Sequence, residues 1–133
     1  MDDPITHGTM FIAVLGSEFV EQPQHTDAVA GEDITLDCLP PRGQPTPRVR
    51  WTKDNSALKP DADRVSVLPS GSLRIRDVKR QDAGSYVCIA YNIGGEKDSN
   101  AARLTVKGVH TSYFVFLTPY IAWQFLSHRI SSY

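Results

Sequence analysis

The chain has 133 residues, of which 41% are hydrophobic and 22% charged, and its formal net charge is −1. These values are typical of one soluble globular domain. Because the charge is so nearly balanced, nothing in the composition points to nucleic acid as a partner.

The N-terminal segment, residues 1–17, does not resemble a secretion signal. It begins with acidic residues where a signal peptide carries basic ones, and its apolar run, residues 10–15, is too short. We therefore expect either that the true N-terminus is missing or that the protein is not secreted.

Between residues 18 and 107 the chain alternates short apolar-patterned segments with turn residues. In "EDITLDC", "RVRWTK" and "SYVCIAYN" every second side chain is apolar, which is the period of a half-buried strand. "DRVSVLP", "GSLRIRDV" and "NAARLTVK" read as further strands, whereas "LPPRGQPTP" has four prolines and predicts an extended loop. Turn signals recur regularly and no segment has helical period. The pattern predicts an all-β sandwich.

The two cysteines, Cys38 and Cys88, fall on the inward faces of two predicted strands. Their separation does not suit a zinc site, which uses close pairs, and the four histidines are scattered far from both. We expect no metal and no cofactor. A disulfide is favoured, and it would place the domain in an oxidising compartment.

Trp51 follows the first cysteine on an inward position, and Tyr86 stands two positions before the second. This Cys…Trp…Cys arrangement with its tyrosine is the signature of an immunoglobulin domain. It predicts an I-set-like β-sandwich with two antiparallel sheets joined by one disulfide, against which the indole packs.

Three more residues complete the expected core signature. Tyr86 should return a hydrogen bond from its hydroxyl to nearby backbone, and Gly84 should permit a tight approach beside it. Asp82 should be partly buried and therefore needs a cation, for which Arg64 is the candidate.

No enzyme is predicted. A nucleophile–base–acid set would need a histidine in the ordered middle of the chain, where only His25 lies nearby, without a neighbouring serine or cysteine. The carboxylates are dispersed, and no glycine-rich phosphate loop precedes a helix. No catalytic residue is assigned.

Residues 13–106 resemble the second immunoglobulin domain of the Roundabout axon-guidance receptors. The resemblance rests on the "PPRG.P.P" loop before the tryptophan strand, on "W.KD", and on the "DAG.Y.C...N..GE" run from Asp82 to Glu96. The loop is its most distinctive part. "AVL", residues 13–15, is similar to the trailing edge of a preceding immunoglobulin domain.

This resemblance implies an extracellular recognition module of a cell-surface receptor, acting in axon guidance or cell adhesion. The implied partners are Slit-like protein ligands, with binding weak without the first domain, and heparan sulfate. Association with the membrane would come only through the rest of such a receptor. The alternative is a structural spacer of the muscle type, or a generic adhesion module, without Slit-related function.

A basic cluster follows the proline-rich loop and is our candidate glycosaminoglycan-binding site: Arg42, Arg48, Arg50 and Lys53. No acidic residue interrupts it. A second basic group, residues 74–80, should lie on the other sheet and be partly neutralised by Asp37 and Asp77. The alternative is that both groups bind no ligand and are solvated strand faces that discourage edge pairing.

The C-terminal tail, residues 108–133, departs from the family. Its apolar stretch, residues 113–126, is shorter than a spanning helix and contains Pro119. A membrane anchor, a segment packed on the domain, and a poorly ordered or non-native tail all remain open.

Overall fold

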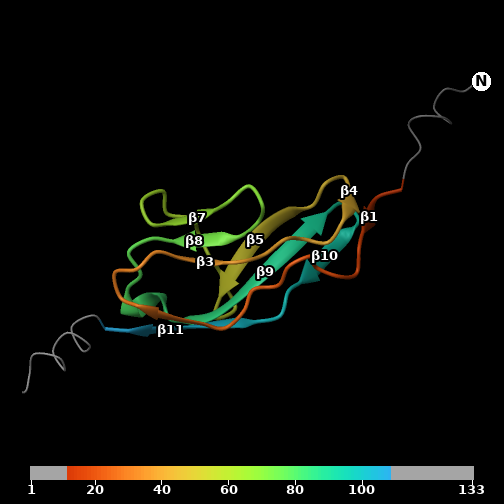
Figure 1. Cartoon of the computed structure of the whole chain (residues 1–133). Coiled ribbons are helices and arrows are strands. Elements are labelled where there is room, and N and C mark those ends of the chain that lie inside the picture. Colours follow the sequence, from red (N-terminus) through yellow and green to blue (C-terminus); the bar gives the residue numbers. More distant parts are fainter. Residues whose placement is uncertain (1–11, 109–133) are drawn as a thin grey trace, which may run out of the picture.

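The computed structural model describes residues 12–108 (Figure 1). The expectations for the extreme N-terminus and for the apolar C-terminal stretch lie outside the described residues. Within residues 12–108, no helix is both long enough and apolar enough to cross a membrane.

The described chain forms two main sheets and a small two-stranded one. The larger sheet has the order β2-β11-β9-β5-β6, with β10 also paired to β9. Its strands are β2 (Thr26–Val29), β5 (Arg48–Lys53), β6 (Ser56–Ala57), β9 (Gly84–Asn92), β10 (Gly95–Asp98) and β11 (Ala102–Lys107). The smaller sheet has the order β3-β8-β7 and consists of β3 (Ile34–Leu36), β7 (Val65–Val67) and β8 (Leu73–Ile75).

Pairing within the sheets is antiparallel except where β2 runs parallel to β11. The third sheet pairs β1 (Val14–Leu15) with β4 (Gly43–Gln44), so this early segment lies on the domain's own proline-rich loop. A short 3-10 helix, η2 (Arg80–Asp82), precedes β9.

The core lies between the two main sheets, where the apolar alternation of each strand points inward. Leu36 of β3, Leu73 of β8 and Leu104 of β11 are each at most 1% exposed. Burial of this kind stabilises by roughly 1.5–3 kcal/mol per large side chain. The predicted all-β immunoglobulin-like sandwich is confirmed.

Among the strands that were not predicted from the sequence, β6 and β10 belong to the larger sheet and carry little apolar pattern. All four residues of β10 are exposed, and β6 has only two residues, also exposed. Backbone pairing with β9 and β5 forms these strands, and side-chain burial contributes little to them. These two strands nevertheless determine which side chains lie beside those of β5 and β9 on the outer face of the larger sheet.

The described chain enters the sandwich at the end that carries β1 and β4 and leaves β11 at the opposite end (Figure 1). The loop before β5 and the β9–β10 hairpin gather at the entry end, as Figure 1 also shows. The basic residues before and within β5 begin at this end.

Candidate recognition surface

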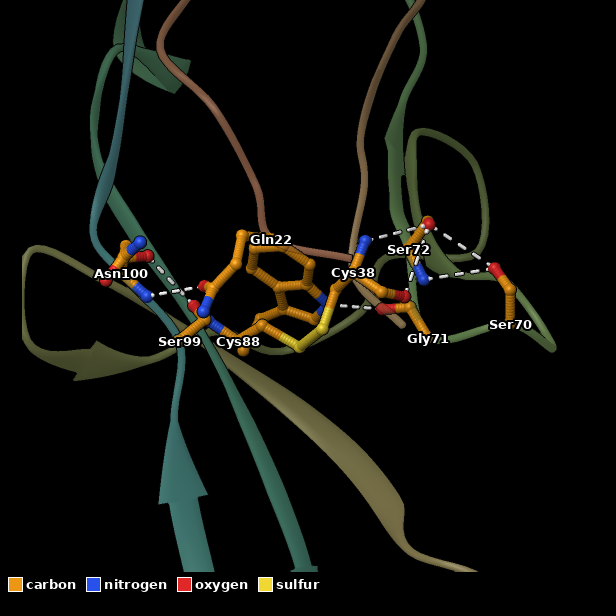
Figure 2. The surroundings of a disulfide bond; sticks show 9 residues. Gln22, Cys38, Ser70, Gly71, Ser72, Cys88, Ser99 and Asn100 are labelled. Atoms are coloured by element: carbon orange, nitrogen blue, oxygen red, sulfur yellow. Dashed lines mark hydrogen bonds between the residues drawn. A yellow bond between two sulfur atoms is a disulfide. The ribbon is translucent and has the colours of Figure 1, made fainter. Parts of the chain in front are cut away.

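The centre of the fold is a disulfide between Cys38, which follows β3, and Cys88 of β9. Their sulfur atoms are 2.06 Å apart and both residues are fully buried (Figure 2). Trp51 of β5 is paired with Cys88 in register and is 2% exposed. Its indole Nε1–H donates to the Gly71 carbonyl at 2.9 Å, so the buried donor is satisfied.

Two buried serines flank the disulfide, one on each side (Figure 2). The Cys38 N–H donates to Ser72 Oγ at 3.0 Å, and the Cys88 N–H donates to Ser99 Oγ at 2.9 Å. Each hydroxyl therefore accepts from a cysteine N–H that would otherwise be unpaired in the core. Sequence reasoning missed both serines, because a serine near a strand end is ordinary until the fold places it beside a cysteine.

At the start of β9, Tyr86 reaches back to η2. The buried Tyr86 hydroxyl donates to the Asp82 carbonyl at 2.6 Å, which is the corner geometry that the sequence led us to expect. Burial raises the pKa of Tyr86, so the phenol stays protonated as a donor.

Arg64 and Asp82 form a two-pronged ion pair beside this corner. Arg64 Nη1 lies 2.8 Å from Asp82 Oδ2, and Nη2 lies 3.1 Å from Oδ1. Burial alone would raise the Asp82 pKa, but hydrogen bonds from Arg64 and from the Lys79 N–H outweigh it and hold the pKa below its usual value. The ion pair links η2, which precedes β9, to the residue directly before β7, and its role is to stabilise the fold.

Gly84 is required by a close approach from the turn between β5 and β6. A Cβ at Gly84 would lie 2.7 Å from Asp54 Oδ2. Asp54 Oδ1 instead accepts the Ser85 N–H at 2.9 Å. The carboxylate thus ties the β5–β6 turn to the first residues of β9.

The candidate recognition surface is the outer face of β5, with the neighbouring parts of β9 and β10. Arg48 and Arg50 both point outward and are exposed, as expected from the alternation. Arg50 Nη2 lies 3.0 Å from Glu96 Oε2 of β10, and its guanidinium carbon is 5.7 Å from the ring centre of Tyr91. Since β10 was not predicted, this carboxylate neighbour was missed.

The four candidate glycosaminoglycan residues do not form one patch. Lys53 has the same strand parity as Trp51, and its ammonium donates to the Gln81 carbonyl beside η2. It therefore does not share the face of Arg48 and Arg50. Arg42 is exposed in the loop just before β4, where its carbonyl accepts the Gly16 N–H at 2.7 Å.

The second basic group is neutralised by a different acid from those expected. Among residues 12–108, the ion pair to Arg74 comes from Asp33 at 3.6 Å, not from Asp37 or Asp77. The Asp77 N–H donates to Asp33 Oδ1 at 2.9 Å, and this hydrogen bond, with Arg74 and Arg76 nearby, lowers the pKa of Asp33. Sequence distance alone could not choose among the acids. Within the same described range, no cluster of potential ligands could hold a metal ion.

The geometry defines a disulfide-centred immunoglobulin sandwich with an arginine-bearing sheet face. The Immunoglobulin I-set domain family matches residues 17–106, and the chain belongs to this family. This is a non-enzymatic family, in agreement with the prediction that the chain is no enzyme.

Among curated proteins the chain is similar to Roundabout receptors. It is 38% identical to Roundabout homolog 3 of Homo sapiens over 100 residues, which cover 75% of this chain and 7% of the relative. It is 42% identical to Protein sax-3 of Caenorhabditis elegans over 100 residues, 74% of this chain and 8% of that protein. The chain thus spans less than a tenth of the length of these relatives.

Solved structures give the same fold. The tandem Ig repeats of Dlar superpose with a TM-score of 0.64 at 30% identity, covering 68% of this chain and 48% of that one. A titin M10–obscurin-like 1 complex gives a TM-score of 0.62 at 33% identity, covering 68% of this chain and 91% of that one. The similar domains therefore include those of a receptor protein tyrosine phosphatase, Dlar, and of a titin–obscurin-like 1 complex.

Proposed function

We propose that residues 18–107 form an extracellular recognition module of a Roundabout-like receptor. The observation that carries this proposal is the similarity to Roundabout proteins over about three quarters of the chain. A buried disulfide, which needs an oxidising compartment to form, supports the extracellular placement. By the resemblance of its proline-rich loop, we assign the module to the second immunoglobulin position and expect Slit as the protein ligand.

A domain exchange tests this assignment. The second immunoglobulin domain of a Slit-binding Roundabout receptor is replaced by residues 18–107, and a parallel exchange uses a titin M10-type domain as control. Surface display and Slit binding are measured on cells. We expect the first exchange to keep both. The titin exchange should keep surface display but bind Slit more weakly, because the first domain of the host receptor remains in place. Normal display with Slit binding no better than the titin control would reject the assignment.

We further propose heparan sulfate as an accessory ligand of the exposed arginines. Arg48 and Arg50 lie on one sheet face, and this supports the proposal, whereas Glu96 opposes it by neutralising Arg50. Changing Arg42, Arg48 and Arg50 to Ser should lower the salt needed to elute the chain from heparin. The matched control changes Arg74, Arg76 and Lys79 to Ser. If both triple variants elute alike, the assignment of the site is wrong.

The second candidate function is a load-bearing spacer, favoured by the similarity to the titin-containing complex. A muscle-type module would work with reduced cysteines. Intact mass of the natively isolated protein, with and without reductant, separates the two functions. A gain of two hydrogen masses on reduction supports the extracellular module, and an unchanged mass supports the spacer.

A further inference from the structure

A hollow opens at the entry end of the sandwich, where the loop before β5 and the β9–β10 hairpin gather and which is called the loop end from here on. It lies between the β5 edge of one sheet and the β7 edge of the other. Its volume is about 500 Å³, within the range of ligand pockets in proteins. An adjoining hollow of about 300 Å³ shares Thr46, Arg48 and Tyr91 with it. The walls of the larger hollow are mostly apolar: Leu39, Pro40, Pro47, Val49, Val67, Leu68 and Pro69.

The hollow exists because β6 is too short to cover the edge of β5. β6 pairs only with Thr52 and Lys53, so the first four residues of β5 have no strand beside them on that edge within the described chain. Val49 points inward there and is only half-buried. The opening between the sheets is therefore lined by side chains that elsewhere in the sandwich would be core.

The charge at the two hollows is positive and comes from one arginine. Arg48 lines both hollows, and no carboxylate lines either of them. Unlike Arg50, Arg48 has no ion-pair partner among residues 12–108. Thr46 and Ser70 add neutral hydroxyl groups to the rim of the larger hollow. An apolar cavity with a single unpaired guanidinium favours a ligand that is apolar and anionic at once.

We propose that this hollow binds a peptide segment of another protein in which an aliphatic or aromatic side chain stands next to a carboxylate. The side chain enters between Val49 and Val67, and the carboxylate pairs with Arg48. The smaller hollow, lined by Pro45 and Ile93, takes a second apolar group of the same segment. A sulfated sugar polymer would use Arg48 but leave the apolar walls unused, so the walls favour a peptide. The proposal goes beyond the Roundabout-like assignment and does not depend on it.

Small probes that separate charge from apolar contact test the chemistry. N-acetyl-leucine, N-acetyl-leucinamide and acetate are titrated into the full 133-residue chain, and amide resonances are followed by NMR. We expect N-acetyl-leucine to shift Val49, Val67 and Gly71 with a dissociation constant in the millimolar range. Its amide should bind about fivefold more weakly, since an exposed ion pair contributes up to about 1 kcal/mol. Acetate should leave Val49 and Val67 unchanged.

Three variants locate the site. Arg48→Gln should remove the preference for N-acetyl-leucine over its amide, whereas Arg50→Gln, on the same strand but outside both hollows, should keep it. Thr46 lines both hollows, so the larger side chain of Thr46→Trp should occupy their space and block binding. The chain's unchanged resonances outside the loop end control for folding in each case.

Three results would overturn the proposal. The first is that N-acetyl-leucine and its amide bind the unmodified chain equally, and the second is that neither shifts the hollow residues. The third is that a heparin-derived tetrasaccharide shifts these residues while N-acetyl-leucine does not, which would assign the surface to a polyanion instead.

Discussion

The disulfide core and the loop end are built on opposite principles. Around the disulfide, each cysteine N–H has a serine hydroxyl as its acceptor, and the indole N–H has a carbonyl. At the loop end, Arg48 is exposed, an apolar hollow opens beside it, and Ile93 is 81% exposed. The N–H groups around the disulfide are therefore all paired within the core, whereas the loop end offers both a charged group and apolar surface for binding a partner. Four changes test how sharp this contrast is.

The largest expected effect is in the core. Trp51→Ala removes the largest buried side chain and leaves a cavity against the disulfide, which should cost about 3–5 kcal/mol of unfolding free energy. Urea denaturation of the oxidised chain measures it. Tyr91→Ala, at the loop end, is the matched aromatic control and should cost much less. Equal losses would abolish the distinction between the two regions.

The Arg64–Asp82 pair comes next. Arg64→Met leaves the largely buried Asp82 carboxylate without its cation, and we expect a loss of about 2 kcal/mol, less than for a fully buried pair. Because the folded pKa of Asp82 is lowered, its stabilisation is complete above the unfolded value of about 4 and disappears as the pH falls toward the folded value.

The pH dependence separates this ion pair from simple packing. Between about pH 5 and pH 2 the unmodified chain should lose stability more steeply than Arg64→Met. Arg103→Met, on an exposed position of β11, should follow the unmodified chain. Parallel curves for all three proteins would show that the Asp82 carboxylate gains nothing from Arg64.

A smaller effect is expected at the serines beside the disulfide. Ser99→Ala leaves the buried Cys88 N–H without its acceptor, at a cost of about 1–2 kcal/mol. Ser56→Ala, on the exposed β6, should be within about 0.5 kcal/mol of the unmodified chain. Thermal unfolding of both variants measures the difference, and a silent Ser99→Ala would mean that another group takes over the acceptor role.

The smallest effect on stability should come from Glu96→Gln on the outer face. Its ion pair with Arg50 is exposed, so the loss should stay below about 0.5 kcal/mol. Binding should respond more, because Arg50 is released and the chain should elute from heparin at higher salt. Glu32→Gln serves as the control of equal charge change. Identical elution of the two variants would show that Glu96 does not mask Arg50.

The sequence predicted what depends on local alternation. β5 has the residues of "RVRWTK", and the inward positions of Cys38, Trp51 and Cys88 follow from the two-residue period of a strand. The roles expected for Tyr86 and Arg64 belong to the same signature, and the structure places their partners within hydrogen-bonding distance. These features could be read from the sequence because each depends on neighbours a few residues away or on a recurrent fold.

Only the tertiary structure decided which distant groups meet. The pairing of Arg50 with Glu96 depends on β10, a charged strand held by backbone hydrogen bonds that leave no apolar pattern in the sequence. The alternation already gave Lys53 the parity of Trp51, but only the fold shows that its ammonium reaches the Gln81 carbonyl beside η2. The hollow beside Arg48 exists because β6 stops after two residues. A buried strand face leaves an alternating apolar pattern in the sequence. Contacts between exposed side chains leave no such pattern, because they depend on strand register and strand length, which are fixed only when the sheets assemble.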